Sequence, residues 1–414
     1  MTITMKSVAV AALTLLTAQA QPNRDWPEWR GPGRHAVLRP GQAPAAWPAS
    51  FNRAWSVAIG EGYSSPVVSG GVTYIHSRQD PQETVTAVDV ATGAVKWRET
   101  YAAPIGKNSY ASQMGKGPNA TPLVTGGRVF TLGASGHILA LDAASGKRLW
   151  SKDFSAMIDT SKLFCGTAAS PILAAGAVVF QVGSDIKGGV VMALDPATGA
   201  ERWQWKGDGP GYASPILATV AGVDQLVTLT NRTVVGLDAK SGRLLWSVPF
   251  PDDWHENIVT PVWTGGKLIV SGIRQGTRAF AIKPDGKGGY APAERWKNAE
   301  VTMYMSSPVA GDGLIYGFSA KRKGQFVALD AETGALKWAS EGREGEQATI
   351  LLAPAHVLYL TNTGALVVAK RTGAGFQEEK RYDISENQTW STPVFMGGAI
   401  VMRDATHLLR LDPK

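Results

Sequence analysis

Short apolar runs alternate with polar, glycine-rich turns along nearly the whole chain after residue 50. Runs such as Val129–Phe130 and Leu314–Tyr316 lie between turn residues and are too short to form helices. The composition agrees with this pattern, since 47 Gly and 24 Pro accompany a charged fraction of only 18%. The sequence therefore predicts an all-β protein of many short strands, with enough apolar residues (44%) to bury a large core.

One eleven-residue pattern, A-x-D-x-x-T-G-x-x-x-W, recurs along the chain with Ser sometimes replacing Thr. It predicts a β-hairpin in which Asp accepts hydrogen bonds from the turn, Gly takes a left-handed conformation and Trp lies on the returning strand. A ring of such Trp side chains would hold neighbouring modules together. The Asp, Gly and Trp of the five full copies are Asp89, Gly93 and Trp97; Asp142, Gly146 and Trp150; Asp195, Gly199 and Trp203; Asp238, Gly242 and Trp246; and Asp330, Gly334 and Trp338.

A second signal, Ser-Pro or Thr-Pro, opens an apolar strand ahead of each copy. Pro suits the first residue of a strand, where the ladder needs no N–H donor. Counting Thr349, where the Pro is lost, gives eight starts separated by 42 to 56 residues. Such periods predict the blades of a β-propeller. The starts are Ser65, Thr121, Ser170, Ser214, Thr260, Ser307, Thr349 and Thr392.

The two ends of this repeat region are expected to meet. The last repeat stops at Lys414 before its fourth strand, while the stretch 51–57 around Trp55 has the pattern of a fourth strand without a blade. Pairing the two would close the ring and hide both strand edges. We therefore predict one domain over residues 51–414, an eight-bladed β-propeller of four-stranded antiparallel blades, preceded by a lead-in segment over residues 21–50. Seven blades with an accessory strand is the alternative that the eight starts disfavour.

The first twenty residues have the pattern of a secretory signal peptide. Lys6 precedes the apolar run 8–16, and small residues lead to a cleavage position after Ala20. The run is too short to span a bilayer, and no other segment is apolar enough to do so. We therefore expect a periplasmic or secreted, monomeric protein without a transmembrane segment in its mature form. Cys165 is the single cysteine, so neither a disulfide nor a Cys/His metal site is expected. The net charge of +7 is scattered and, with export, argues against a nucleic-acid partner.

The D-x-x-T-G-x-x-x-W pattern resembles the tryptophan-docking repeat of the quinoprotein superfamily of propellers, named after pyrroloquinoline quinone (PQQ). The resemblance covers about residues 51–414, and the stretch 26–32 (WPEWRGP) is similar to the lead-in of exported PQQ-like repeat proteins. It implies either a PQQ- and calcium-dependent alcohol or aldose dehydrogenase, or a non-catalytic member such as the propeller lipoprotein of the outer-membrane barrel-assembly machinery. The enzymes often carry two adjacent cysteines and use a Glu, an Asn and an Asp that no motif places here. The lipoprotein carries a lipid-acceptor Cys that this chain lacks.

Candidate binding residues precede the inner strands, where they should line one mouth of the central channel. A ring of aromatic and amide side chains suits a planar or sugar-like ligand, although the same residues also serve simply to fill a funnel. A polar cluster at 252–257 adds a possible base, His255, and oxygen donors, while the long insertion 101–118 is a further candidate loop. The candidates are Tyr63, Asn119, Tyr212, His255, Glu256, Asn257, Met305, Gln347 and Trp390, with Thr167 and Ala168 at the remaining position.

Three functions follow from this reading. The first is a non-catalytic binding or scaffold protein of the cell envelope, whose partner is an envelope protein, a peptide or a glycan. The second is a dehydrogenase that holds PQQ and Ca²⁺ at the channel mouth. The third is a sensor of a glycan or small ligand. We take the first as our prediction, with no catalytic or metal-binding residue assigned, because the repeats predict a fold and not a reaction.

Overall fold

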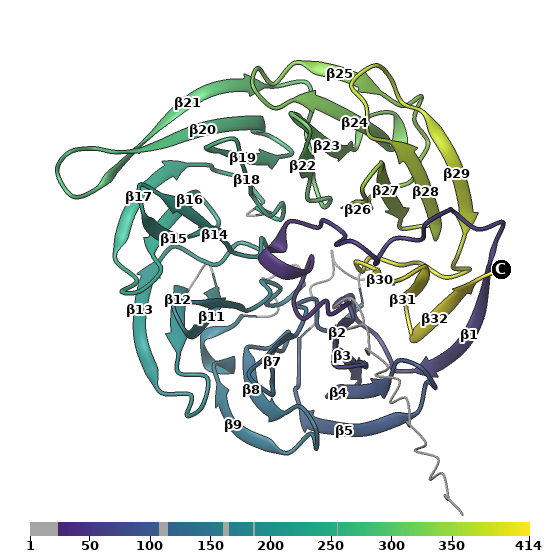
Figure 1. Cartoon of the computed structure of the whole chain (residues 1–414). Helices are drawn as coiled ribbons and strands as arrows, with labels where there is room; N and C mark the ends of the chain where they lie inside the picture. The colour runs from purple at the N-terminus through teal and green to yellow at the C-terminus, as the bar shows by residue number, and fades with distance from the viewer. Residues whose placement is uncertain (1–23, 107–114, 160–164, 185–186, 255) are drawn as a thin grey trace, which may run out of the picture.

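Eight four-stranded antiparallel sheets form a closed ring in the computed structural model of the chain (Figure 1). The structure describes residues 24–106, 115–159, 165–184, 187–254 and 256–414. In blades 1 to 7 consecutive strands pair with one another, so each blade is a simple meander. The strands of blades 1 to 4 are β2 (Val67–Ser69), β3 (Val72–Gln79), β4 (Gln82–Asp89) and β5 (Val95–Ala102); β6 (Leu123–Thr125), β7 (Arg128–Leu132), β8 (His137–Asp142) and β9 (Arg148–Asp153); β10 (Ile172–Ala174), β11 (Ala177–Ser184), β12 (Gly188–Leu194) and β13 (Glu201–Gly207); and β14 (Ile216–Val220), β15 (Val223–Leu229), β16 (Thr233–Asp238) and β17 (Leu244–Pro249).

Blade 8 is built from both ends of the described chain, in the order β1-β32-β31-β30. The predicted eight-bladed propeller and its closure by an N-terminal strand are therefore confirmed. The strands of blades 5 to 8 are β18 (Val262–Thr264), β19 (Lys267–Gly272), β20 (Gly276–Pro284) and β21 (Tyr290–Asn298); β22 (Val309–Gly311), β23 (Leu314–Ser319), β24 (Gln325–Asp330) and β25 (Leu336–Ala339); β26 (Ala348–Leu352), β27 (His356–Thr361), β28 (Ala365–Lys370) and β29 (Glu378–Asp383); and β30 (Val394–Met396), β31 (Ala399–Arg403), β32 (His407–Pro413) and β1 (Phe51–Ala58).

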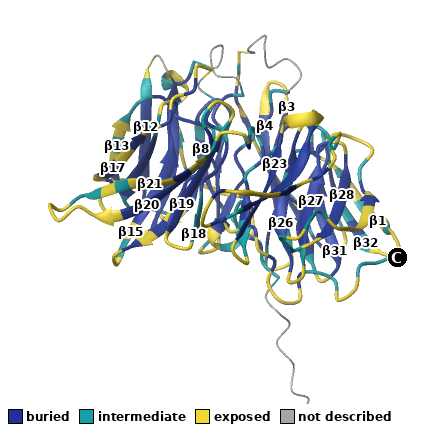
Figure 2. Cartoon of the chain, turned by 90° about the horizontal axis from the view of Figure 1, so that it is seen from above, coloured by how far each residue is buried: buried dark blue, intermediate teal, exposed yellow. Residues whose placement is uncertain are grey.

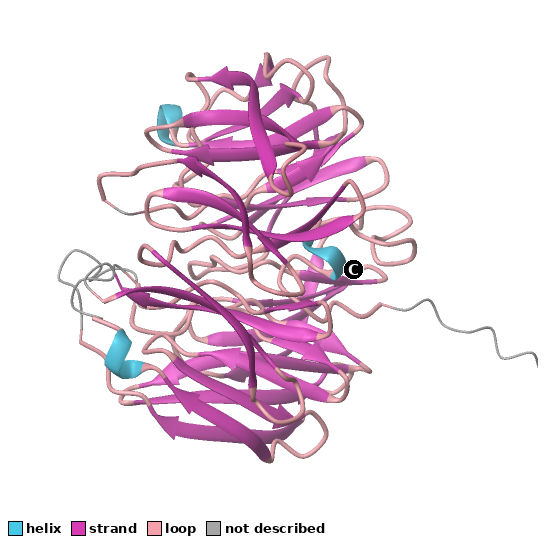
Figure 3. Cartoon of the chain, turned by 90° about the vertical axis from the view of Figure 1, so that its left-hand side faces the viewer, coloured by secondary structure: helices cyan, strands magenta, loops and turns pink. Residues whose placement is uncertain are grey.

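The middle strands of the blades carry the core, whereas the outermost strands alternate between partly buried and exposed residues (Figure 2). Strand β11, for example, is buried along its whole length, while four of the six residues of β9 are exposed. Helical structure in the described residues is limited to short 3-10 turns (Figure 3), and none is long and apolar enough to cross a membrane. These turns are η1 (Pro32–Arg34), η3 (Ser155–Met157) and η4 (Lys321–Lys323).

The repeated turn has the chemistry that its residues predict. Between β4 and β5, Asp89 Oδ1 accepts hydrogen bonds from the backbone N–H groups of Ala91 and Thr92, at 3.1 and 3.0 Å. The Thr92 hydroxyl donates to the same oxygen at 3.0 Å, and Gly93 has a φ of 74°. These hydrogen bonds hold the pKa of Asp89 below its ordinary value. The Asp89 carboxylate thus provides hydrogen-bond acceptors for the backbone N–H groups of the turn that leads into the outer strand.

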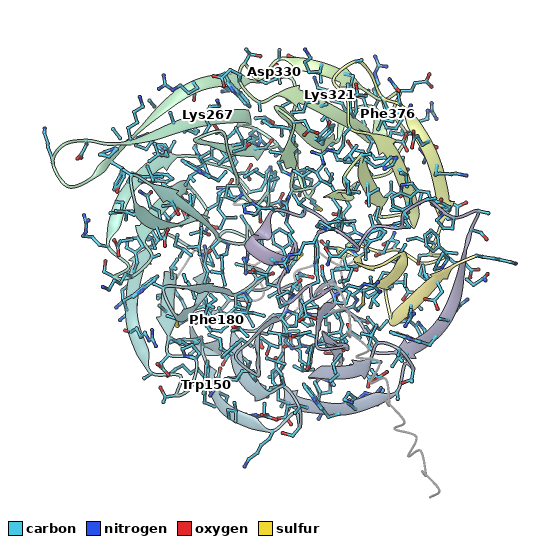
Figure 4. All side chains as sticks on the ribbon, in the orientation of Figure 1. Trp150, Phe180, Lys267, Lys321, Asp330 and Phe376 are labelled. Atoms are coloured by element: carbon cyan, nitrogen blue, oxygen red, sulfur yellow. The ribbon has the colours of Figure 1, made fainter. Side chains whose placement is uncertain are left out.

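The Trp ring of the preceding blade packs directly against each repeat Gly. A β-carbon built on Gly146 would lie 2.6 Å from two ring carbons of Trp97, so only Gly allows this contact. The Trp97 indole Nε1–H then donates to Ala143 O of blade 2 at 3.0 Å. Trp150 packs against the cluster that contains Phe180 of blade 3 (Figure 4). The corresponding pairs are Gly93 with Trp55, Gly199 with Trp150, Gly242 with Trp203 and Gly334 with Trp296.

The seam of the ring consists of the β1–β32 pairing within blade 8 and of one buried arginine that links blade 8 to blade 1. Strand β1 runs antiparallel to β32, with Phe51 opposite Pro413 and Ala58 opposite His407. Arg403, which is 1% exposed, donates from Nη2 to Gly60 O at 2.9 Å and from Nη1 to His76 O at 3.3 Å. Burial lowers the pKa of Arg403 to about 10. The seam therefore does not depend on the β1–β32 ladder alone.

The segment before β1 fills the centre of the ring. Trp26 forms an antiparallel bridge with Val68 of blade 1, and Val37 forms a parallel bridge with Leu352 of blade 7. Between them, η1 lies near the ring centre in Figure 1. Arg34 is 3% exposed and donates to the carbonyl oxygens of two further blades. The sequence predicted residues 21–50 only as a lead-in, yet residues 26–38 form an internal plug of the propeller, whereas residues 39–50 are mostly exposed and lead out to β1 (Figure 1).

Candidate functional site

A funnel of about 160 Å³ opens at one end of the channel, above the plug. It is lined mainly by the residues that precede the inner strands of the blades, and Trp29 of the plug joins them. The Tyr63 and Trp390 rings lie 5.3 Å apart at an angle of 33°, so blades 1 and 8 present an aromatic wall. The lining residues that the sequence predicted are Tyr63, Asn119, Ala168, Tyr212, Met305, Gln347 and Trp390.

Asn257 does not line the funnel as expected, although it is the matching residue of blade 5. Its side-chain amide is buried and donates to the carbonyl oxygens of Thr230, Asn231 and Phe250, at 2.8 to 3.1 Å. Ile258 lines the funnel in its place. The amide therefore joins the loops of blade 4 to the entry of blade 5.

The polar cluster at 252–257 provides one carboxylate near the funnel. Tyr304 donates a short hydrogen bond from its hydroxyl to Glu256 Oε2. Burial raises the pKa of Glu256 above its ordinary value, Asp252 adds to this rise, and the bond from Tyr304 opposes it. Predicted candidate His255, like residues 107–114 of the long insertion, lies outside the described residues.

Cys165 also lines the funnel, which the sequence did not predict. Burial is the main reason why the pKa of its thiol rises to about 12, and Glu256 adds to this effect. The thiol is therefore protonated at neutral pH and is a poor nucleophile. Its carbonyl oxygen accepts a bond of 3.4 Å from the Asn119 amide. Cys165 thus contributes to the shape of the funnel rather than to a reaction.

A ring of hydroxyl groups lies beneath these residues, at the Ser or Thr of the Ser-Pro and Thr-Pro signals. The backbone N–H of each residue donates to the hydroxyl of the corresponding residue in the next blade, at 2.8 to 3.0 Å. Blade 7 interrupts the ring among the described residues, since Thr349 Oγ1 is buried without a hydrogen-bond partner. The links run from Ser65 to Thr121, Thr121 to Ser170, Ser170 to Ser214, Ser214 to Thr260, Thr260 to Ser307, and Thr392 to Ser65.

A second cavity of about 70 Å³ lies at this interruption. It shares Trp29, Met305, Ser307, Gln347 and Trp390 with the funnel, so the two cavities have a common wall. The remaining lining comes from the plug and from blades 7 and 8. These residues are Arg30, Ala348, Thr349, Ile350 and Thr392.

The funnel residues do not fit PQQ with calcium. No three His, Cys, Asp or Glu side chains in the described ranges are grouped as a metal site. Glu256, the carboxylate beside the funnel, is already bonded to Tyr304. The funnel of about 160 Å³ is close in volume to a closed cavity of about 150 Å³ that holds one benzene ring.

A known protein family matches most of the repeat region. The profile of the family described as outer membrane protein assembly factor BamB matches residues 45–216, 187–288 and 230–381. The protein of that name from Yersinia pestis is 24% identical over 278 residues, which are 64% of this chain and 66%, just under two thirds, of that protein's length.

Solved structures share the fold at low identity. BamB from Moraxella catarrhalis superposes with a TM-score of 0.59 and 14% identity, over 88% of this chain and 98% of that one. Quinohemoprotein alcohol dehydrogenase from Comamonas testosteroni superposes with a TM-score of 0.67 and 16% identity, over 95% and 81%. At such identities the likeness is one of fold, which an enzyme and an assembly factor share.

Proposed function

This chain belongs to the family of the outer membrane protein assembly factor BamB, and from that premise we propose that it is a non-catalytic scaffold that binds a protein partner during the assembly of outer membrane proteins. The observation that carries the proposal is the family match over most of the propeller, together with a funnel whose residues do not fit the quinone. We further propose that the chain is exported to the periplasm, with cleavage after Ala20, and that it acts as a monomer.

The rim of the funnel offers a contact site for such a partner. Trp254, on the loop that leads to Ile258, is 70% exposed, more than any other large hydrophobic side chain among the described residues. Exposed Trp residues are frequent energetic centres of protein interfaces. The second most exposed, Leu336 at 47%, lies on the outer strand β25, away from the funnel, and provides a matched control.

Gene deletion and complementation test this proposal. Loss of the protein should reduce the amount of folded outer membrane proteins, measured by their heat-modifiable migration in gels. Wild type and Leu336→Ala should restore it, and Trp254→Ala should restore less. Wild type should also co-purify the outer membrane protein assembly machinery from solubilised envelopes, and Trp254→Ala should recover less of it. Unchanged outer membrane proteins in the deletion strain would contradict the proposed role.

A quinone titration tests the alternative of a dehydrogenase. The purified chain is titrated with PQQ, with and without Ca²⁺, while Trp fluorescence and dye-linked oxidation of alcohols and aldoses are followed. We expect neither saturable quenching nor turnover. Calcium-dependent quenching together with turnover would overturn the non-catalytic proposal and make the funnel an active site.

A further inference from the structure

Arg30 of the plug is a buried cation that has no carboxylate partner among the described residues, and its guanidinium lies 5.5 Å from the centroid of the Trp29 ring. Its side chain is 3% exposed, and Nη2 donates a short hydrogen bond to Pro308 O. Nε and Nη1 are buried and have no hydrogen-bond partner among the described residues. The nearby carboxylate of Glu28 pairs with Arg34 instead, at 3.1 Å. Burial, reinforced by the charge of Arg34, lowers the pKa of Arg30 to about 9, so the guanidinium still carries its charge at neutral pH.

The buried charge of Arg30 destabilises the folded state unless another group compensates it. An unpaired buried charge is among the most destabilising features that a protein interior can hold. Arg30 also has a φ of 62°, a conformation that few residues other than Gly adopt. A strained backbone and an uncompensated charge at one residue are typical of a ligand-binding position. An anion bound beside Arg30 would compensate this charge.

Three more residues with an unpaired buried polar atom line the same small cavity. Trp390 Nε1, Gln347 Nε2 and Thr349 Oγ1 are buried and unpaired, and all three residues line the cavity with Arg30. The indole and amide nitrogens are donors only, and a hydroxyl can donate as well. Thr349 is also the position at which the hydroxyl ring of the other blades is interrupted. Four unsatisfied groups able to donate hydrogen bonds around one cavity match an acceptor-rich, negatively charged ligand.

The sizes of the two cavities limit the ligand. About 70 Å³ is enough for a carboxylate, since one water takes about 30 Å³ in the liquid. The adjoining funnel of about 160 Å³ has aromatic walls from Tyr63 and Trp390 and accepts a body the size of one ring. We propose that the floor of the funnel binds the carboxylate of a small, ring-sized carboxylic acid through Arg30, Gln347 and Trp390. This site goes beyond the scaffold function, and neither proposal depends on the other.

Benzoate is the probe for this site, and benzamide is its uncharged match in shape. The purified full chain is titrated with each by isothermal calorimetry and thermal unfolding at neutral pH, with acetate and sulfate as further arms. We expect saturable benzoate binding that raises the melting temperature, at least about tenfold weaker benzamide binding, and intermediate acetate binding. Equal binding of benzoate and benzamide, or no saturable benzoate binding up to about 10 mM, overturns the proposal. Binding of sulfate without benzoate also overturns it, because the ligand would then be an inorganic oxyanion.

Single substitutions test which residues bind benzoate. Arg30→Met keeps the length of the side chain and should lose benzoate binding by about tenfold or more, and Arg30→Lys should recover part of it. Arg53→Met, at an exposed position of β1 and outside the cavity lining, is the control and should keep the benzoate affinity. If Arg30→Met does not fold, the benzoate affinity of Trp390→Phe tests the site instead. This change removes one hydrogen-bond donor and keeps the aromatic wall. Wild-type affinity in folded Arg30→Met, or in Trp390→Phe, contradicts the proposed site.

Discussion

The indole ring of Trp97 lies directly on Gly146, so the outer strand of blade 1 packs against the repeat turn of blade 2. This contact explains why the pattern contains both residues in every full copy. Gly serves two purposes there, since it has a φ of 74° and also leaves room for the ring of the preceding blade. The same contact joins blade 8 to 1, blade 1 to 2, blade 2 to 3, blade 3 to 4 and blade 5 to 6.

Replacing Gly146 should therefore destabilise the protein more than backbone strain alone explains. Gly127 of the same blade has a φ of 71°, but a β-carbon there would meet nothing within 4 Å. We expect Gly127→Ala to lower the free energy of unfolding by about 1 kcal/mol. Gly146→Ala should lower it by about 1–3 kcal/mol more, because the Trp97 ring must move. Denaturant unfolding measures both, and equal losses would show that the ring contact contributes nothing.

Glu83 should give the propeller a defined sensitivity to acid. Burial pushes the pKa of this carboxyl upward, but hydrogen bonds from His76 and Tyr101 and the charge of His76 outweigh it and leave the pKa below its ordinary value. A lowered carboxyl pKa stabilises the folded state above the unfolded pKa of about 4.3, and the contribution is lost as pH falls through the lower, folded pKa. The Tyr101 hydroxyl bond is 2.5 Å, and Ala134 N–H donates to the other oxygen at 3.0 Å.

Glu83→Gln should accordingly lower the free energy of unfolding by about 3 kcal/mol at pH 7. The difference from wild type should shrink as pH falls below the unfolded pKa of about 4.3 and through the lower, folded pKa, since wild type then loses the charge as well. Unfolding curves at several pH values measure this difference. Glu201→Gln, at an exposed position of β13, is the control and should follow wild type. A difference that does not change with pH would contradict a charged Glu83.

The bond between Tyr304 and Glu256 should be visible in a titration. This bond lowers the pKa of Glu256, while burial and Asp252 raise it. Tyr304→Phe should therefore shift the midpoint for Glu256 upward. Carbon NMR of the labelled glutamate side chain measures it, and Tyr63→Phe in the same funnel should leave the midpoint unchanged. An unaltered midpoint in Tyr304→Phe would mean that the bond does not persist in solution.

Arg403 should matter for closure of the ring. Arg403→Lys keeps a positive charge but cannot reach Gly60 O and His76 O together, because an ammonium lacks the planar fork of a guanidinium. We expect a loss of about 2–3 kcal/mol in the free energy of unfolding and faster proteolysis within β1. Arg53→Lys, at an exposed position of β1, should change stability by less than about 0.5 kcal/mol. Similar effects of the two changes would place the strength of the seam in the β1–β32 ladder alone.

Much of the candidate site could be located from the sequence, because most lining residues precede a recognisable inner strand, Trp29 of the plug being an exception. Tyr63, Tyr212 and Trp390 were predicted in this way. Asn257 was misplaced by one residue, since the backbone of blade 5 turns its amide toward three carbonyl groups and presents Ile258 instead. Whether these residues bind a ligand remains a prediction.

The sequence by itself determined the blades, because the turn chemistry of Asp, Thr and Gly is local and repeats in register. It also contained the hydroxyl ring, although the Ser-Pro signal was interpreted through Pro alone. Only the tertiary structure decided the inside of the channel. Arg30 meets Pro308 across 278 residues of chain, and no local pattern reports on such a contact. The plug, the interrupted hydroxyl ring and the unpaired donors around them exist only once all eight blades close around the N-terminal segment.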